Sequence, residues 1–502
     1  MDDGRSPLEV ACIQGECEQM PESIRVSIIG AGSAQFSLTL VKDLCLTPSL
    51  AGSQVVFVDV NEERLGVVHK LATRYANEVG ADLRFESCAD WRTTLCGSDF
   101  VINTAYVKGH PHEWAMRDIA AEHGYYYDGV HLGDFYQLQL ALDVAREMQQ
   151  ACPDAWLIQS ANPVFNCCTL VARDTETKVC GLCHGHLGYR AIARTVGIDP
   201  QRVVWQAPGF NHDIWLTHFI YEGEDAYPLI DEWISSRAEE YWRSHVATHT
   251  HDIHMSRAAV HQYHMYGLFP VGDTVRRVGA GSTVGCTARE GEWWYHTDLE
   301  SKKYWFGEPW GGPDSETGRR FFERRLESRI AEMAEAANDE KVRLTDLLGS
   351  AKTGEQMVSV IDALVNDTAG QFQVNVPNHG AIEGVPGDVV VEVPAVVSRK
   401  GIQPIHVGSL PAKVMLECLL PHWLDMERNL LAFRTGDLSV LLWNALGSHQ
   451  TRSYEQGMAV LQDLLSMKGH EEMNQHFGFP PGWRPGGRSS TRANPTRVKK
   501  RD

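Results

Sequence analysis

The feature that most constrains the fold of this chain is a glycine turn between a predicted strand and a predicted helix near residue 30. Residues 24–29 form a short, mostly apolar β-branched run, and residues 36–44 repeat apolar side chains at helical spacing. Between these segments, Gly30 and Gly32 would let backbone N–H groups approach a pyrophosphate at the start of the helix. Gln35 stands where the usual motif has its third glycine, so the turn alone is also consistent with a purely structural role.

A carboxylate at the end of the next predicted strand favours the binding role. Residues 55–58 form a second buried strand, and Asp59 follows it directly. In dinucleotide-binding folds a carboxylate at this place accepts hydrogen bonds from the ribose hydroxyls and repels a 2′-phosphate. The glycine turn and Asp59 together therefore predict binding of NAD rather than NADP.

The rest of the N-terminal half continues the alternation of strands and helices. Residues 99–104 and 155–160 read as strands with a helix at about 138–150 between them, which predicts a doubly wound parallel sheet. Beyond residue 209, helical candidates at 319–337, 412–433 and 454–466 mix with a β-rich stretch at 388–397, which predicts a second, α+β domain. The predicted organisation is a disordered extension at 1–22, an NAD-binding Rossmann-type domain at 23–208, an α+β substrate and metal domain at 209–480, and a basic disordered tail at 481–502.

Composition excludes several classes of protein. The chain has 502 residues and a net charge of −19, which argues against nucleic-acid binding because phosphate neutralisation needs a basic surface. It has no run of 18 apolar residues that could span a membrane, and its acidic start does not resemble a signal peptide. We therefore expect a cytoplasmic protein whose 12 irregularly spaced cysteines are reduced thiols.

A pair of cysteines followed by a histidine allows several interpretations. Cys180, Cys183 and His184 match the spacing of c-type haem attachment, but that chemistry takes place outside the cytoplasm. A dithiol redox pair is a second alternative, and one buried thiol with one site-lining thiol is the least specific interpretation. His212 directly follows Asn211 and lies 29 residues after Cys183, and Cys183 with His212 is too few ligands for a closed zinc site but suits an open one.

Two further polar segments are ambiguous by themselves. Asp273 and Arg276 lie three residues apart in a turn-like stretch, which by itself predicts a surface turn with a local ion pair. A histidine-rich run at 245–264 fits no single metal-ligand spacing, so we interpret it as a solvated or interfacial helix.

Taken together, these segments resemble glycoside hydrolase family 4. The resemblance runs from about residue 24 to residue 475 and includes both the cofactor half and the catalytic half. Within the family, residues 272–276 and 307–312 are most similar to the bacterial α-glucosidase branch. The matching segments come in the family's order: 28–34, 43–45, 59–65, 103–105, 161–163, 181–186, 211–212, 374–378 and 391–394.

The resemblance implies a glycosidase that works through transient oxidation, an exception to the usual pair of carboxylates. NAD⁺ takes a hydride from C3 of the sugar, and the resulting ketone acidifies the proton on C2. A base removes that proton, the group on C1 leaves, water adds, and the hydride returns, so no net oxidation remains. A divalent cation, usually Mn²⁺, stabilises the negative charge on the C2 and C3 oxygens.

The resemblance also implies a role for each matching residue. Metal ligands would be Cys183 and His212. Asp273 would be the C2 base, with Arg276 beside it to lower its pKa. The expected cofactor-binding residues are Gly30, Gly32, Ser33, Asp59 and Asn103, and the expected substrate-binding residues are Asn162 and Asn211.

One segment departs from the family pattern. Residues 125–135 are shorter than the α-glucosidase loop that supplies an acidic side chain near the leaving group. Asp128, His131 and Asp134 are all candidates for that role, and the sequence does not choose among them.

The expected function is hydrolysis of α-glucosides such as maltose-like oligosaccharides. The same mechanism on α-galactosides, α-glucuronides or α-galacturonides is the nearest alternative, and a lactate- or malate-type NAD-dependent dehydrogenase is a more distant one. A catalytically silent sugar sensor that binds NAD is a third. On resemblance we expect a homodimer or homotetramer that binds a small glycoside and neither nucleic acid nor membrane.

Overall fold

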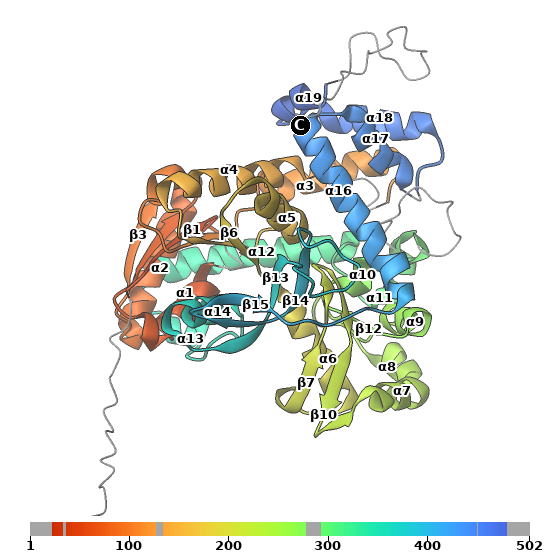
Figure 1. Cartoon of the computed structure of the whole chain (residues 1–502), viewed down its shortest axis with the longest axis horizontal. Helices are drawn as coiled ribbons and strands as arrows, with labels where there is room; N and C mark the ends of the chain where they lie inside the picture. The colour runs from red at the N-terminus through yellow and green to blue at the C-terminus, as the bar shows by residue number, and fades with distance from the viewer. Residues whose placement is uncertain (1–22, 34–36, 127–133, 278–292, 449, 479–502) are drawn as a thin grey trace, which may run out of the picture.

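The computed structural model describes residues 23–33, 37–126, 134–277, 293–448 and 450–478. The predicted terminal extensions at 1–22 and 481–502 lie outside this part of the chain. One mixed sheet dominates the described residues, and helices cover both of its faces (Figure 1). No described helix is long and apolar enough to cross a bilayer.

The first half of the sheet is the predicted doubly wound parallel unit. Its spatial order is β3-β2-β1-β4-β5-β6, and each neighbouring pair is parallel. The strand order reverses next to β1, which is where ligands bind in folds of this kind. The six strands are β1 (Arg25–Ile29), β2 (Gln54–Val58), β3 (Arg84–Cys88), β4 (Phe100–Asn103), β5 (Trp156–Gln159) and β6 (Lys178–Gly181).

The second half of the sheet continues from β6 with antiparallel strands, in the order β13-β14-β8-β9-β12. The sheet thus passes without a break through both predicted domains, and the boundary predicted between residues 208 and 209 stays a prediction. A small separate sheet holds β7 (Val203–Gln206), β10 (His218–Tyr221) and β11 (Glu224–Asp225). The antiparallel strands are β8 (Gly209–Phe210), β9 (Asp213–Leu216), β12 (Phe269–Val271), β13 (Gly370–Pro377), β14 (Val390–Ser398) and β15 (Gly401–Pro404), which pairs with β14.

The predicted helices of the N-terminal half form where the apolar spacing indicates. The predicted helix at 138–150 is the central part of α4, whose inward face buries Leu138, Leu142 and Val144. These helices are α1 (Ser37–Cys45), α2 (Glu62–Val79), α3 (Gly109–Glu122), α4 (Phe135–Ala151), α5 (Val164–Asp174) and α6 (Gly188–Val196).

In the C-terminal half, the structure divides one predicted helix. The prediction at 412–433 becomes α15 (Ala412–Val414), a π-helical turn at Met415–Leu419, and α16 (Leu420–Thr435). Pro421 lies in the first turn of α16, where its missing N–H costs least, and the wider turn precedes it. The other helices are α7 (Tyr227–Ser236), α8 (Ala238–Ser244), α9 (Arg257–Tyr266), α10 (Thr274–Arg277), α11 (Leu299–Phe306), α12 (Glu316–Asn338), α13 (Leu344–Leu348), α14 (Met357–Asn366), α17 (Leu438–Gly447), α18 (Tyr454–Leu465) and α19 (Glu471–His476).

Segments of the C-terminal half return to cover the parallel sheet. The carboxylate of Glu78 on α2 accepts hydrogen bonds from the backbone N–H groups of Leu344 and Thr345, at 2.8 and 2.9 Å. Lys42 of α1 donates to the carbonyl of Leu348 at 2.8 Å. Because one apolar core includes residues from both halves, the relative positions of the two halves are fixed by packing as well as by the shared sheet.

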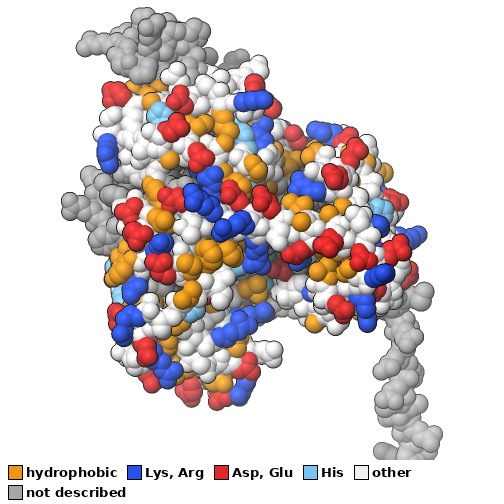
Figure 2. Space-filling model, turned by 180° about the vertical axis from the view of Figure 1, so that it is seen from behind, with side chains coloured by type: hydrophobic (Ala, Val, Ile, Leu, Met, Phe, Trp, Pro, Cys, Tyr) orange, Lys and Arg blue, Asp and Glu red, His pale blue; other side chains and the backbone are white. Residues whose placement is uncertain are grey.

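Charged groups are mixed over the surface. On the face drawn in Figure 2, acidic and basic side chains intermingle, consistent with a chain that carries 65 acidic and 46 basic residues.

Candidate active site

The glycine turn opens a cleft of 1320 Å³ that runs along the carboxyl ends of the parallel strands. Gly30 has a φ of +87°, and a Cβ added there would lie 2.5 Å from the backbone of Ala105. A Cβ on Gly32 would lie 2.7 Å from the carboxylate carbon of Asp59. Gly30 therefore requires glycine, whereas a side chain at position 32 would displace the Asp59 carboxylate. The turn keeps its backbone close to the cleft.

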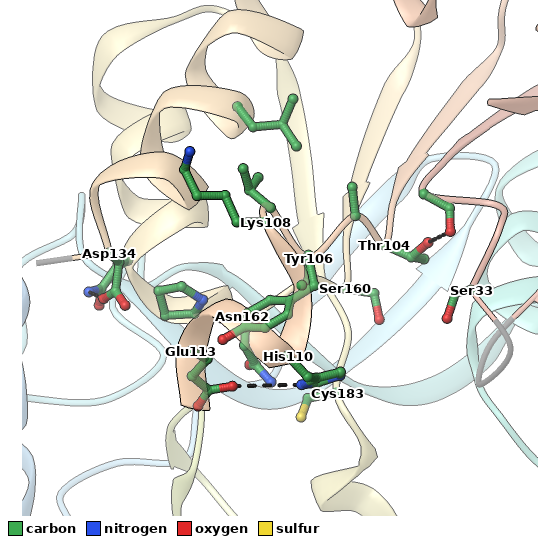
Figure 3. A pocket seen from close by; sticks show the side chains of 18 of the residues that line it. Ser33, Thr104, Tyr106, Lys108, His110, Glu113, Asp134, Ser160, Asn162 and Cys183 are labelled. Carbon is green, nitrogen blue, oxygen red and sulfur yellow. Dashed lines mark hydrogen bonds and ion pairs between the residues drawn. The ribbon is translucent and has the colours of Figure 1, made fainter. Parts of the chain in front are cut away.

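Asp59 faces this turn from the end of β2. Its carboxylate accepts hydrogen bonds from the backbone N–H groups of Gly32 and Asn61, both at 2.8 Å. Ser33 also lines the cleft, on the same side of the drawn pocket as Thr104 (Figure 3). Gly30, Gly32, Ser33 and Asp59, all predicted to bind the cofactor, thus lie together.

Asn103 lies beneath the cleft instead of lining it. Its side chain is 1% exposed and donates to Gln159 at 3.0 Å, while its oxygen accepts from the backbone N–H of Ala105 at 3.2 Å. Asn103 thus links β4 to β5 and fixes the backbone that faces Gly30. Any effect of Asn103 on a cofactor would act through Ala105.

The predicted metal ligands meet further along the cleft. Cys183 follows β6 at the start of a short 3₁₀ helix, and His212 lies in the tight turn between β8 and β9 with a φ of +65°. The Cys183 Sγ and the His212 Nε2 are 3.3 Å apart. Metal–nitrogen bonds near 2.1 Å and metal–sulfur bonds near 2.3 Å would place two such ligand atoms about 3.1 to 3.6 Å apart, so one cation can bind both.

Only one of the two predicted ligands is already in the protonation state that binds a cation. Burial lowers the pKa of His212 to about 4, so its imidazole is neutral and able to coordinate at physiological pH. Burial, with the nearby charges of Glu392 and Asp273, raises the pKa of Cys183 to about 12. The thiol must therefore lose a proton when a cation binds.

The predicted base lies beside the same ring nitrogen of His212 that faces Cys183. Asp273 Oδ2 is 3.4 Å from His212 Nε2, and Arg276 binds the same carboxylate through Nε at 3.0 Å and Nη2 at 3.3 Å. Although burial opposes it, the charge of Arg276 and its neighbours holds the pKa of Asp273 well below its usual range. The predicted surface turn with a local ion pair is therefore an ion pair in the cleft wall.

The two predicted substrate-binding asparagines occupy different depths. Asn162 follows β5, is exposed, and lines the cleft beside Cys183 in the close-up (Figure 3). Asn211 is 4% exposed and donates to the buried carboxylate of Glu392 at 2.9 Å. Asn211 therefore supports the metal-site backbone from below, and Asn162 is the one with an accessible side chain.

Of the three candidates for leaving-group acid, only Asp134 lies in the described part of the chain. It lines the cleft and accepts a hydrogen bond from Asn166 at 3.1 Å. Asp128 and His131 lie outside the described residues.

The two cysteines of the Cys180–Cys183 pair lie in different environments. Cys180 is fully buried while Cys183 lines the cleft, which matches the least specific of the three interpretations.

The histidine-rich run is not one helix, which corrects the prediction: residues 245–256 are irregular and α9 begins at Arg257. Within that irregular stretch, His251 lines the cleft and contributes to the field at Asp273.

Sequence reasoning gave no role to two acidic residues of the site. Asp314 accepts a short hydrogen bond from Nη1 of Arg276 and lies 3.8 Å from Arg117, so it holds the arginine from the side opposite Asp273. Glu392 is 1% exposed, and burial raises its pKa to about 7. Glu392 belonged to a segment that carried the resemblance, but neither residue has a spacing that could have indicated its partner.

Among the described residues, no group of three or more histidine, cysteine or acidic side chains forms a preformed metal cage. A site with two protein ligands leaves most coordination positions to water or substrate, which is the open arrangement of catalytic metals. The fold is thus a parallel sheet of the dinucleotide-binding type. At the carboxyl ends of its strands lies a site where one cation could bind two side chains.

Comparison with known proteins identifies the family. Residues 25–198 match the model of family 4 glycosyl hydrolases, and residues 207–451 match the model of the family 4 glycosyl hydrolase C-terminal domain. The chain belongs to glycosyl hydrolase family 4.

Curated relatives and solved structures agree with this assignment. An alpha-glucosidase of Erwinia rhapontici is 26% identical over 409 residues, 77% of this chain and 85% of the relative. An alpha-galactosidase of Bacillus subtilis is 24% identical over 405 residues, 78% of this chain and 85% of the relative. The fold is similar to that of a 6-phospho-alpha-glucosidase from gut microorganisms in complex with NAD and Mn²⁺, with a TM-score of 0.68 and 17% identity over 90% of this chain and 98% of that one.

Proposed function

We propose that this chain hydrolyses α-glucosides, such as maltose-like oligosaccharides, by transient oxidation of the sugar with NAD⁺ and Mn²⁺. The observation that carries the proposal is the convergence at His212. Cys183 Sγ and Asp273 Oδ2 lie 3.3 and 3.4 Å from His212 Nε2, in the same cleft as Gly30. A base beside a cation site is what proton removal next to a ketone requires.

The glycine turn fits a dinucleotide. Gly30 and Gly32 leave no room for a Cβ, so the backbone can approach a pyrophosphate, and Asp59 stands where the adenosine ribose would be held. When bound, NAD⁺ supplies a reversible acceptor for the C3 hydride. The residues that would hold it are Gly30, Gly32, Ser33 and Asp59.

The donor set at Cys183 and His212 fits a divalent cation. A neutral imidazole and an ionisable thiol face each other at a distance that one ion can bridge. When bound, Mn²⁺ supplies a Lewis acid for the sugar oxygens. Because a thiolate is a soft ligand and Mn²⁺ is the weakest binder of the common divalent series, we expect easy loss of the metal and inactivation by thiol oxidation.

Asp273 would act as the base that takes the C2 proton. Its low pKa keeps it ionised at neutral pH, and the two contacts from Arg276 fix the plane of the carboxylate. The proton would move from C2 to a carboxylate oxygen of Asp273, and Asn162, which lines the cleft, would donate to a sugar hydroxyl. Positioning of this kind matters because a base must lie within hydrogen-bond reach of the proton it removes.

Leaving-group protonation is assigned to the segment around Asp134. Asp134 lines the cleft, and Asn166 holds its carboxylate at 3.1 Å. Asp128 and His131 remain alternatives for the same role.

The expected homodimer or homotetramer also remains a prediction, and a measurement of the mass in solution tests it.

A panel of p-nitrophenyl glycosides tests the proposed function. We expect nitrophenol release from the α-glucoside with NAD⁺ and Mn²⁺ both present, and no net accumulation of NADH. Release from an α-galactoside or α-uronide instead would keep the mechanism and change the sugar. Accumulation of NADH without nitrophenol would indicate a dehydrogenase, and binding of NAD without any cleavage would indicate a sensor.

Removal of the metal is a second test of the same proposal. Chelation should abolish nitrophenol release, and Mn²⁺ added under a reductant should restore it. Activity that survives chelation would contradict the assignment of Cys183 and His212.

A further inference from the structure

A row of paired residues crosses the sheet between the two segments that hold the predicted metal ligands. Strands β6, β13 and β14 lie side by side in the sheet (Figure 1), and β8 follows β14. Along the row, Gly181 of β6 pairs with Asn375 of β13, and Asn375 pairs with Glu392 of β14. Glu392 pairs on its other side with Gly209 of β8. The thiol ligand follows one end of the row and the imidazole ligand follows the other, so the row connects the two ligand segments.

The buried carboxylate of Glu392 contacts both ligand segments. Its Oε2 accepts a hydrogen bond from Nδ2 of Asn211 at 2.9 Å, and Asn211 directly precedes His212. A Cβ added to Gly185, two residues after Cys183, would lie 3.1 Å from Oε1 of the same carboxylate. The backbone of the thiol loop therefore packs closely against one oxygen of Glu392, while the turn with the imidazole is bonded to the other.

Asn375 adds a second donor to the same carboxylate. Its Nδ2 lies 3.4 Å from Oε2 of Glu392 and 3.4 Å from the carbonyl oxygen of Gly181, so one amide connects the acid to the strand that leads into the thiol loop. A Cβ on Gly181 would lie 2.8 Å from the Cβ of Asn375, so glycine at this position permits the close approach. Because a buried carboxylate without hydrogen bonds costs free energy, the loss of these contacts opposes a shift of either segment.

Two features of the cation site make such support important. Only two protein ligands are predicted, so affinity depends on keeping Cys183 Sγ and His212 Nε2 near the 3.3 Å separation that one ion can bridge. His212 also has a φ of +65°, a strained conformation for a residue other than glycine, which persists only where the surrounding structure imposes it. The hydrogen bond from Asn211 to Glu392 fixes the residue directly before this strained position. The direction of the imidazole therefore depends on a contact with Glu392.

We propose that Glu392 is a positioning residue of the cation site, which holds the loop of Cys183 and the turn of His212 at the separation that one divalent cation requires. Among the described residues no third acidic, histidine or cysteine side chain joins the two ligands in one group, so Glu392 acts from outside the coordination shell, through Asn211 and the backbone of Gly185. The inference rests on the proposed function, because it takes the two ligands from it, and it adds a role for an acid to which the mechanism gives none.

The affinities for Mn²⁺ and for NAD, each measured by calorimetry, test this role without turnover. Glu392→Val suits a strand but removes both oxygens, so the Kd for Mn²⁺ should rise about tenfold or more, the scale at which metal sites respond to loss of the groups that orient their ligands. Glu392→Gln keeps an oxygen that can accept from Asn211, so its Kd for Mn²⁺ should stay within about threefold of the wild-type value. The Kd for NAD should stay within about twofold in both variants, because the glycine turn and Asp59 lie on other strands.

Glu86→Val is the matched control, because Glu86 is an exposed glutamate on β3 of the same sheet and outside the cleft, and both of its Kd values should equal those of the wild type. If Glu392→Val does not fold, Asn211→Ala removes the same hydrogen bond from its other end and should raise the Kd for Mn²⁺ by a similar factor.

Three results would overturn the positioning role while leaving the glycosidase intact. They are an unchanged Kd for Mn²⁺ in the variant that removes the hydrogen bond, an equal loss of Mn²⁺ and NAD affinity, and a loss in Glu392→Gln as large as in Glu392→Val. If the wild-type chain binds no Mn²⁺, the assignment of Cys183 and His212 fails, and the role of Glu392 fails with it.

Discussion

The two ends of the reacting part of the cleft are built in different ways. At the cofactor end, Gly30, Gly32 and Asp59 come from two neighbouring parallel strands, and the site consists mostly of backbone N–H groups and one carboxylate. At the reaction centre, Cys183 and His212 are joined by Asp273 and Arg276 from a segment beyond β12. The first site is local and preformed, whereas the second exists only when distant strands pack in register.

This contrast predicts that changes at the reaction centre act on chemistry and changes at the cofactor end act on affinity. The backbone cradle would bind NAD with or without a correct base, because its contacts lie on other strands. The following predictions test that separation, from the largest expected effect to the smallest.

The largest effect is expected from the base. Asp273→Asn removes the carboxylate that we propose as the acceptor of the C2 proton, so kcat should fall by about 10³-fold, within the range of general base catalysis. The Kd for NAD, measured by calorimetry, should stay within about twofold of the wild-type value. Asp82→Asn on the exposed surface is the control. If Asp273→Asn kept more than about a tenth of the wild-type kcat, Asp273 would not be the base.

The next effect is expected at the cation. Cys183→Ser replaces a thiolate by a hydroxyl that stays protonated, so the Kd for Mn²⁺ should rise by about 100-fold or more, the scale at which weakened metal sites respond. Cys96→Ser is the control, because Cys96 is exposed and outside the cleft. Equal Mn²⁺ affinity in Cys183→Ser and the wild type, measured by calorimetry, would mean that the thiol does not bind the cation.

The pH dependence of cation binding follows from the two ligand pKa values. The pKa of His212 is about 4, so above pH 6 the imidazole is already neutral and releases no proton. The pKa of Cys183 is about 12, so binding must displace one thiol proton throughout the neutral range. The Mn²⁺ affinity should therefore rise about tenfold per pH unit between about pH 6 and pH 8. An affinity that does not change with pH would contradict thiolate ligation.

The smallest effect is expected at the glycine turn. Gly32→Ala would place a Cβ 2.7 Å from the Asp59 carboxylate, so Asp59 must move and the Kd for NAD should rise about tenfold. At saturating NAD, kcat should stay close to the wild-type value. Gly66→Ala is the control: a Cβ on this glycine of α2 meets nothing within 4 Å, so stability should rise by about 1 kcal/mol without a change in NAD affinity. A loss of kcat in Gly32→Ala at saturating NAD would mean that the glycine turn also affects the chemical step, and would contradict the separation of affinity from chemistry.

The same contrast explains how much could be read from the sequence. The parallel sheet and the glycine turn were predictable because strand, turn and helix signals lie within about 40 residues of one another, and β1, α1 and β2 form where they indicate. The meeting of Cys183 with His212 was reached only through the family resemblance, because spacing alone could not fix a contact between separate strands.

Other features could not be predicted because they depend on tertiary packing. Asp314 follows two glycines and a proline in a segment without periodicity, and its contact with Arg276 forms only when the segment between α11 and α12 folds back on α10. The single mixed sheet was missed because pairing of β6 with β13 joins residues 181 and 375. The helix prediction for the histidine-rich run was wrong because the spacing of its histidines does not show where each one lies. His245 is partly exposed, whereas His251 lines the cleft.

The most direct test of the account is the fate of the C2 hydrogen of the sugar. Hydrolysis is run to completion in deuterated water with NAD⁺ and Mn²⁺, and the released sugar is analysed by NMR. The account predicts that deuterium enters at C2, because Asp273 exchanges its proton with solvent before it returns one, while C3 keeps its own hydrogen. A released sugar that keeps the original hydrogen at C2 would show that the linkage breaks without proton removal, and would contradict the account.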